Sequence, residues 1–171
     1  MLSIRAEKGP DAAALRALHL AAFAPRHNEA DLVDRLREAN QSTISLVALS
    51  DGQLAGHVLF SPVTLDPAWP SLRGLGLGPL AVLPNLQRQG IGSRLAMRGL
   101  EVTRDAGFDF VVVLGAAAYY QRFGFKPATR FHLDSDYTAG DDFMAVELQP
   151  GALGGVTGRV HYRPEFAQAG C

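Results

Sequence analysis

Residues 80–95 read Leu80-Ala81-Val82-Leu83-Pro84-Asn85-Leu86-Gln87-Arg88-Gln89-Gly90-Ile91-Gly92-Ser93-Arg94-Leu95. This stretch predicts an apolar strand, then a turn, and then a helix that begins among glycines. Because glycine has no Cβ, a ligand can approach the backbone closely there. The first turn of a helix leaves its N–H groups unpaired and carries partial positive charge. We therefore expect an anion site suited to a pyrophosphate, with Arg88 and Arg94 at its rim.

Two common phosphate-binding motifs do not fit this sequence. A Walker loop requires Gly-Lys followed by Ser or Thr, and the chain has no such lysine. A dinucleotide fingerprint places Gly-x-Gly-x-x-Gly after the strand, whereas Gly74-x-Gly76-x-Gly78 precedes and enters it. Taken alone, Gly-x-Gly at a helix start is equally consistent with a tight structural turn. The surrounding residues are needed to choose a ligand.

The rest of the chain predicts strands and helices in an order typical of an α/β protein. Antiparallel hairpin strands come first, because Asp51-Gly52 is a strong hairpin turn. A strand–helix–strand unit then predicts parallel pairing in the middle of a mixed sheet. The predicted strands are 2–6, 44–49, 54–65, 75–83, 110–114, 131–133, 143–148 and 160–162. Four helices are predicted. The first is capped by Asp11, the second begins with a capping box formed by Asn28 and Asp31, and the other two span residues 89–106 and 117–123.

Composition narrows the class of protein. The chain has 171 residues, 47% of them hydrophobic, which suits one domain with a proper core. Its formal net charge of −1 argues against a nucleic acid bound through a general basic field. The single cysteine, Cys171, cannot form an internal disulfide or a metal cluster. No apolar run has signal-peptide or membrane-spanning length. We therefore expect a cytoplasmic protein without metal, nucleic-acid or membrane partners.

Two motifs resemble those of the GNAT acyltransferase superfamily. Residues 87–92, Gln-Arg-Gln-Gly-Ile-Gly, resemble its Gln/Arg-x-x-Gly-x-Gly/Ala signature and follow a Val-x-Pro strand end, as in that superfamily. Residues 119–125, Tyr-Tyr-Gln-Arg-Phe-Gly-Phe, resemble its aromatic-Tyr-x-x-x-Gly-Phe segment at the expected spacing. Residues 56–63 and 143–153 look like segments of YhbS-type bacterial N-acetyltransferases. The resemblance implies a single GNAT domain over residues 1–171, with helices on both faces of a mixed sheet and a splayed pair of parallel strands.

The resemblance also implies where acetyl-CoA, as acyl donor, would bind. In GNAT proteins the strand before the signature splays from its neighbour, and its free backbone groups bind the pantetheine arm. Here that strand carries Leu80, Ala81 and Val82, and the nearby Pro79 cannot donate a backbone hydrogen bond. An edge strand with a tolerated proline is the alternative. The pyrophosphate would lie on residues of the signature and first helical turn, namely Gln87, Arg88, Gln89, Gly90, Ile91, Gly92, Ser93 and Arg94.

Tyr120 matches the family tyrosine that protonates the departing thiolate. A phenol with a pKa of about 10 is protonated at neutral pH and can donate to the sulfur as charge develops. The alternative is a packing or CoA-contacting tyrosine without proton transfer. Tyr119, at the adjacent aromatic position, is expected to pack.

The group that deprotonates the acceptor amine is harder to assign. Glu29, at the start of the second predicted helix, is our candidate, although a solvated first-turn acid explains it as well. His57 has a suitable pKa, but a core histidine is the competing interpretation. A water relay is a third option. Residues 115–118, Gly-Ala-Ala-Ala, depart from the family because they offer CoA no polar side chain.

These inferences define a function and its alternatives. We expect an N-acetyltransferase that moves an acetyl group from acetyl-CoA to a small-molecule amine or a peptide or protein amine by direct attack in a ternary complex. A non-catalytic acyl-CoA sensor of the same fold, transfer to a hydroxyl, and transfer of a longer acyl chain stay open, as does a homodimer. Acceptor-side segments are expected at residues 25–29, 66–73 and 131–142. The last of these contains Asp134, Asp136, Asp141 and Asp142, which could attract a cationic amine or simply form a solvated loop.

Overall fold

A computed structural model describes residues 1–171, and the chain divides into two compact units. Unit 1 comprises Met1–Ser61, Pro79–Gly99 and Pro164–Cys171. Unit 2 comprises Pro62–Gly78 and Leu100–Arg163. We describe each unit by itself. The prediction of one domain over residues 1–171 stays a prediction.

Unit 1 is built on an antiparallel sheet. Strands β1 (Leu2–Ala6), β2 (Ile44–Ser50) and β3 (Gln53–Asp66) follow one another in the sheet, and the unit contains the part of β3 up to Ser61. Asp51 and Gly52 have φ of 49° and 82°, as the predicted two-residue hairpin requires. Leu83 directly follows strand β4 (Gly74–Val82), and its backbone N–H donates to the carbonyl oxygen of Ala55 in β3 at 2.9 Å. The end of β4 therefore lies beside β3.

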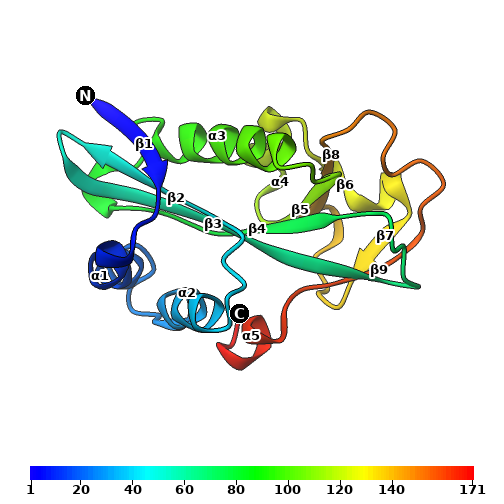
Figure 1. The fold of residues 1–171 in the computed structure, drawn as a ribbon, viewed down its shortest axis with the longest axis horizontal. Coiled ribbons are helices and arrows are strands. Elements are labelled where there is room, and N and C mark those ends of the chain that lie inside the picture. Colours follow the sequence, from blue (N-terminus) through cyan, green and yellow to red (C-terminus); the bar gives the residue numbers. More distant parts are fainter. The chain divides into compact units, whose positions relative to one another are not determined.

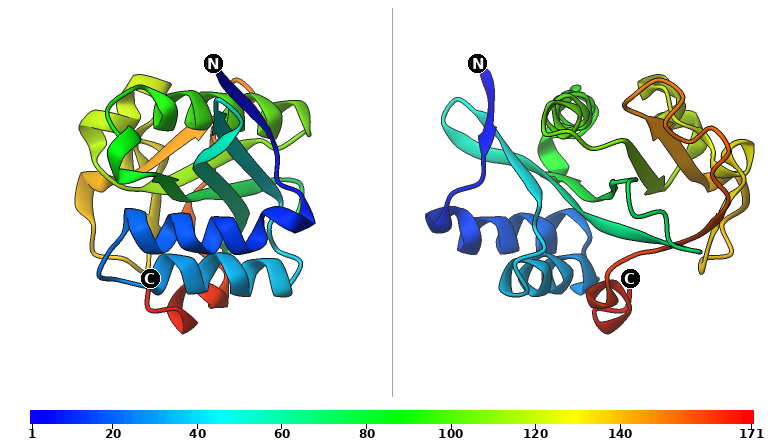
Figure 2. Two further views of the ribbon diagram at one scale, coloured as in Figure 1. Left: turned by 90° about the vertical axis from the view of Figure 1, so that its left-hand side faces the viewer. Right: turned by 45° about the vertical axis from the view of Figure 1, so that its right-hand side comes forward.

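Helices cover both faces of the unit 1 sheet (Figure 1). Helix α3 (Ile91–Asp105) packs on one face, where a Cβ on Gly56 would lie 2.9 Å from Leu95 and one on Gly99 would lie 2.4 Å from Phe60. Helices α1 (Ala12–Ala22) and α2 (Asn28–Glu38) lie on the other face. Figure 2 shows α1 and α2 side by side, with the short helix α5 (Pro164–Gln168) next to α2. The sequence predicts that Leu15, Leu18 and Ala22 of α1 and Leu32, Val33 and Leu36 of α2 face the core. All of them are buried except Ala22, which is half-buried.

The predicted helix caps are wrong in both α1 and α2. The Asp11 carboxylate caps the preceding 3-10 turn instead: it accepts the Lys8 N–H at 2.8 Å and binds the Arg5 guanidinium. No Asn28–Asp31 capping box forms, because Asp31 binds Arg16 and Asn28 donates to the carbonyl of Gly170. Asp11 is thus occupied by residues that precede it, whereas Asn28 and Asp31 are occupied by residues that are distant in sequence.

Unit 2 contains the parallel pair that the sequence predicted. Strand β4 pairs parallel with β5 (Phe110–Leu114), and β8 (Phe143–Glu147) pairs antiparallel with β5, so the sheet is mixed. The two-residue strand β6 (Lys126–Pro127) pairs with β8. Strand β9 (Gly158–His161) joins the end of β3 to β7 (Leu133–Ser135). Residues Val112, Ala145 and Val160, among others, form the apolar core of this unit.

Residues 131–133 were predicted as a strand, and this is only partly right. Ala128–Phe131 form a 3-10 helix, and His132 has φ of 56°, so extended structure starts at Leu133. Two short elements, β6 and α5, were not predicted because neither is long enough to show a hydrophobic period. None of the helices combines the length and the apolar character needed to cross a bilayer.

Candidate active site

The loop between β4 and α3 brings the predicted anion-binding residues together in unit 1. A 3-10 turn, Pro84–Leu86, follows β4, and the Gln87 side chain donates back to Val82 O at 3.1 Å. Arg88 and Gly90 then have φ of 60° and 84°, so both lie in the left-handed region just before the helix. Helix α3 therefore begins at Ile91 rather than at residue 89 as predicted.

This geometry can hold an anion. Arg94 N–H donates to Gly90 O at 3.0 Å, which closes the first helical turn. The first turn of a helix generally directs N–H groups outward, and the helix dipole adds partial positive charge there. A Cβ on Gly90 would have no other atom within 4 Å, so the space next to this backbone is open. The side chains of Arg88 and Arg94 are exposed. Buried Ile91 and Leu95 attach the turn to the sheet.

Strand β4 changes character at Gly78. Its parallel ladder with β5 runs from Gly74–Phe110 to Leu77–Val113, and Gly78 then has φ of 150°. Pro79, which has no N–H, follows. The segment of Leu80, Ala81 and Val82 belongs to unit 1, where Ala81 is buried and the other two are half-buried.

Tyr120 lies in unit 2, on helix α4 (Ala117–Tyr120). Asp142 starts this helix by accepting the Ala117 N–H at 3.2 Å. The Tyr120 ring crosses the backbone of Gly115 so closely that a Cβ there would lie 2.5 Å from a ring carbon. Phe125 packs edge-on against the ring, with ring centroids 5.8 Å apart. Burial, and to a lesser degree the neighbouring Tyr119, raises the pKa of Tyr120 to about 12. Its hydroxyl therefore stays protonated at neutral pH.

Glu29 lies in the first turn of α2, as predicted, but it is not a solvated acid. Its side chain is only 12% exposed. One carboxylate oxygen, Oε1, is 2.6 Å from Nη2 of Arg26. The other oxygen, Oε2, is buried and has no hydrogen-bond partner.

His57 belongs to a buried polar network of unit 1. Its Nδ1 is 2.8 Å from Nε2 of His19, and its Nε2 is 2.8 Å from the hydroxyl of Ser45, which also contacts Glu7. Both histidines are fully buried. Burial lowers the pKa of His57 against the opposing effect of Glu7, so the ring is neutral at neutral pH. His57 has no surface from which to contact a substrate, which agrees with the core interpretation.

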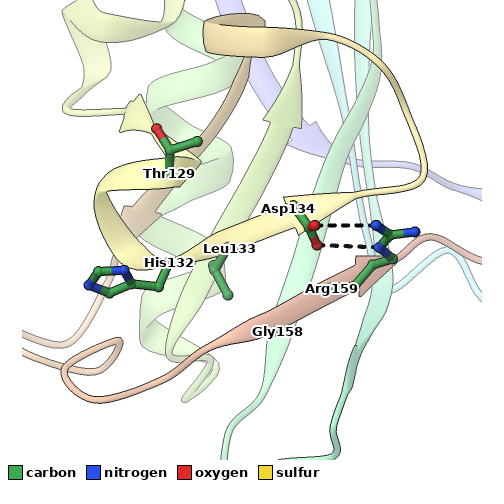
Figure 3. A pocket seen from close by; sticks show the side chains of 6 residues that line it. All are labelled: Thr129, His132, Leu133, Asp134, Gly158 and Arg159. Atoms are coloured by element: carbon green, nitrogen blue, oxygen red, sulfur yellow. Dashed lines mark hydrogen bonds and ion pairs between the residues drawn. The ribbon is translucent and has the colours of Figure 1, made fainter.

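Two of the four aspartates in the segment 131–142 of unit 2 form ion pairs. Asp134 is 3.3 Å from the Arg159 guanidinium, and Asp136 binds both Arg159 and His161. Figure 3 shows the first of these pairs beside a cavity of about 430 Å³. The cavity is lined by six residues of β7, β9 and the segment before β7: Thr129, His132, Leu133, Asp134, Gly158 and Arg159. Asp134 and Asp136 thus share the single positive charge of Arg159.

Residues 12–125 match the acetyltransferase (GNAT) family, so the chain belongs to that family and is an acetyl-CoA-dependent N-acetyltransferase. Its curated relatives include the uncharacterized N-acetyltransferase YhbS of Escherichia coli K12, which is 39% identical over 165 residues, covering 95% of this chain and 97% of the relative.

Two solved structures resemble this fold over nearly its whole length. The E. coli YhbS structure in complex with CoA has a TM-score of 0.90 and 37% identity, and the match covers 97% of this chain and 92% of that one. A GNAT family acetyltransferase from Brucella melitensis in complex with acetyl-CoA has a TM-score of 0.81 and 38% identity, with coverage of 97% and 98%. The predicted family and fold class are therefore confirmed.

Proposed function

We propose that this chain binds acetyl-CoA with the pyrophosphate on the backbone amides between Arg88 and Arg94 and with the pantetheine arm along Leu80–Val82. The observation that carries the proposal is the pair of left-handed residues, Arg88 and Gly90, directly before an open helix start. The break in the β4–β5 ladder at Gly78 supports the second part, because it leaves backbone groups of the following residues for a ligand. CoA and acetyl-CoA in the two related structures support the choice of cofactor.

The proposed reaction is direct transfer to an amine in a ternary complex. The amine nitrogen attacks the thioester carbonyl, a C–N bond forms, and the C–S bond breaks. The departing sulfur takes a proton from the Tyr120 hydroxyl, whose pKa of about 12 keeps it in the protonated form needed by a general acid. The nitrogen loses one proton to Glu29 or to a water that Glu29 orients. The acceptor is an amine of a small molecule or of a peptide or protein.

The cofactor site is tested by Gly92→Leu. A bulky side chain in the first turn of α3 blocks close approach of the pyrophosphate, so CoA affinity should fall by at least about tenfold, or ~1.4 kcal/mol. Isothermal titration calorimetry with CoA measures this. Met97→Leu, which changes a side chain 52% exposed on the same helix, is the control and should bind CoA like the parent. Equal CoA affinity in Gly92→Leu and the parent would place the pyrophosphate elsewhere.

A further inference from the structure

Two aromatic rings of unit 2 lie directly against the backbone of β4. A Cβ on Gly74 would lie 2.2 Å from the ring of Phe110, and a Cβ on Gly76 would lie 2.6 Å from the ring of Tyr162. Glycine permits this close approach because it has no side chain. A Cβ on Gly78, where the ladder with β5 has ended, would meet no other atom within 4 Å. Of the two rings, Tyr162 is therefore the one nearer along β4 to the break in the ladder.

Tyr162 directly follows β9 and presents a neutral ring. The residue is half-buried, whereas its hydroxyl oxygen is buried, so the exposed part of the residue is not the hydroxyl. Burial, and to a lesser degree Tyr137 and Tyr120, raise the pKa of the Tyr162 hydroxyl far above its usual value. The side chain therefore carries no charge at neutral pH. A neutral phenol ring attracts a cation through its face.

Two other tyrosines of unit 2 connect Tyr162 with the proposed reaction. Tyr137 belongs to segment 131–142, which the sequence predicted on the acceptor side, and it packs edge-on against Tyr162 with ring centroids 5.7 Å apart. Tyr120 is the proposed proton donor, and it lies close enough to contribute to the raised pKa of Tyr162. Tyr162 thus has the expected acceptor segment as one neighbour and the proposed general acid as another.

We propose that Tyr162 forms the acceptor-side wall of the reaction centre and that the acceptor enters as an alkyl ammonium ion over its ring. The inference rests on the proposed function in placing acetyl transfer beside the break in β4 at Gly78. It adds the charge state of the entering acceptor and names Tyr162 as the residue that selects for it. The ring discriminates because it attracts a cation more strongly than a neutral molecule of the same shape. The bound ion loses its extra proton to water before the nitrogen attacks.

A dead-end complex with CoA allows a test without turnover, because CoA carries no acetyl group. The full-length protein, saturated with CoA, is titrated with n-butylammonium chloride, and saturation-transfer NMR of the probe measures its affinity. n-Butanol, which has the same carbon chain and no charge, is the control. n-Butylammonium should bind at least about fivefold more tightly than n-butanol, because only the cation gains from the ring.

Three variants separate the ring from the hydroxyl and from general packing. Tyr162→Phe keeps the ring and should bind n-butylammonium like the parent. Tyr162→Leu removes the ring and should weaken this binding by about 5- to 30-fold. Phe108→Leu removes another half-buried ring of unit 2, one that packs against the Arg73 guanidinium, and should leave the affinity unchanged. Thermal unfolding and CoA titration verify that the variants are folded.

A measurement on the parent protein covers the case in which Tyr162→Leu does not fold. The chain has four tyrosines, so selective labelling of tyrosine rings leaves few signals to assign. An NOE should join the α-methylene group of n-butylammonium to one labelled ring, and it should vanish in Tyr162→Phe, which identifies the ring as that of Tyr162.

Three outcomes would overturn the proposal: equal affinities for n-butylammonium and n-butanol, a folded Tyr162→Leu variant with the parental affinity, or no NOE to Tyr162. The proposed acetyl transfer is judged separately, by CoA binding in Gly92→Leu and by turnover. A parent protein that does not bind CoA would count against that function. Intact CoA binding without preference for the cation would count against the role of Tyr162 alone.

Discussion

The Tyr120 ring lies against Gly115 and Phe125, and its hydroxyl has a pKa of about 12. Replacing Tyr120 by Phe keeps this packing and removes the proposed proton donor. Turnover should fall by about 10²- to 10⁴-fold, the usual effect of losing a general acid, while acetyl-CoA affinity stays unchanged. Because Tyr120 is half ionised only at about pH 12, its titration should cause no alkaline loss of activity between pH 7 and pH 10 in the parent.

Single-turnover kinetics with release of free thiol measure the Tyr120→Phe effect when chemistry limits the rate. Tyr119→Phe, which changes the adjacent tyrosine of the same short helix, is the matched control and should remain close to the parent. A Tyr120→Phe variant with the parental rate would remove this hydroxyl from the mechanism.

Glu29 supports a second prediction at the scale of one residue. Glu29→Gln preserves size and removes the charge that would meet a cationic acceptor. Loss of a charged hydrogen bond, ~1.5–3 kcal/mol, should lower kcat/KM for the amine by about 10- to 150-fold, with acetyl-CoA affinity retained. Glu38→Gln, at the exposed far end of α2, is the control. A parental kcat/KM in Glu29→Gln would mean that this carboxylate does not meet the amine.

At the scale of elements, the buried network joins α1 to β2 and β3 of unit 1. Burial alone would raise the pKa of Glu7, but the nearby His57 ring, whose Nε2 is 3.7 Å away, together with hydrogen bonds from Ser45 and Arg37, outweighs burial and lowers the pKa to about 2. The negative charge of Glu7 determines which ring nitrogen carries the proton in His57 and in His19. The Ser45 hydroxyl donates to Glu7 and accepts from His57 Nε2–H, so His57 Nδ1 must accept from Nε2–H of His19. This leaves Nδ1 of His19 as a buried acceptor without a donor.

The network predicts that stability falls in acid. Burial, then the charges of His57 and Arg37, lower the pKa of His19 to about 3, against a partial opposing effect of Glu7. A histidine whose pKa is lower in the folded state contributes its full stability above the unfolded pKa of about 6.5, and that contribution is lost as the pH falls from there toward 3. Glu7 loses its own contribution only below about pH 4.5, so the two buried histidines, His19 and His57, account for the network's loss of stability between pH 6.5 and 4.5.

His19→Gln isolates this effect, because an amide can still donate to His57 but does not titrate. Urea unfolding at a series of pH values should give a shallower decline of the free energy of unfolding between pH 6.5 and 4.5 than in the parent. His27→Gln, which changes a histidine whose side chain is 69% exposed, should leave the decline as it is. Identical slopes in His19→Gln and the parent would contradict the assignment of the acid loss to His19.

At the scale of the whole molecule, unit 1 holds the loop proposed for the pyrophosphate, together with Glu29 and the C-terminal segment. Unit 2 holds Tyr120 and the parallel β4–β5 pair. Strands β3 and β4 and helix α3 run through both units.

The sequence alone was sufficient for the features that depend on neighbours in the chain. The Asp51-Gly52 hairpin, the glycine loop before α3, the buried strand 110–113 and the short helix that carries Tyr120 follow from turn chemistry and hydrophobic period, and all are present. The family also followed from the sequence, because its two motifs are contiguous stretches with a set spacing.

Only the tertiary structure showed which residues distant in sequence contact each other. His19 meets His57 across 38 positions, and Asn28 meets Gly170 across 142 positions. The predicted capping box failed for this reason, since Asn28 and Asp31 found partners outside their own helix. Glu29 was likewise open to two interpretations from the sequence, and only the structure shows that its side chain is 12% exposed. Local propensity is encoded in neighbouring residues, whereas the satisfaction of a buried charge depends on every segment that folds against it.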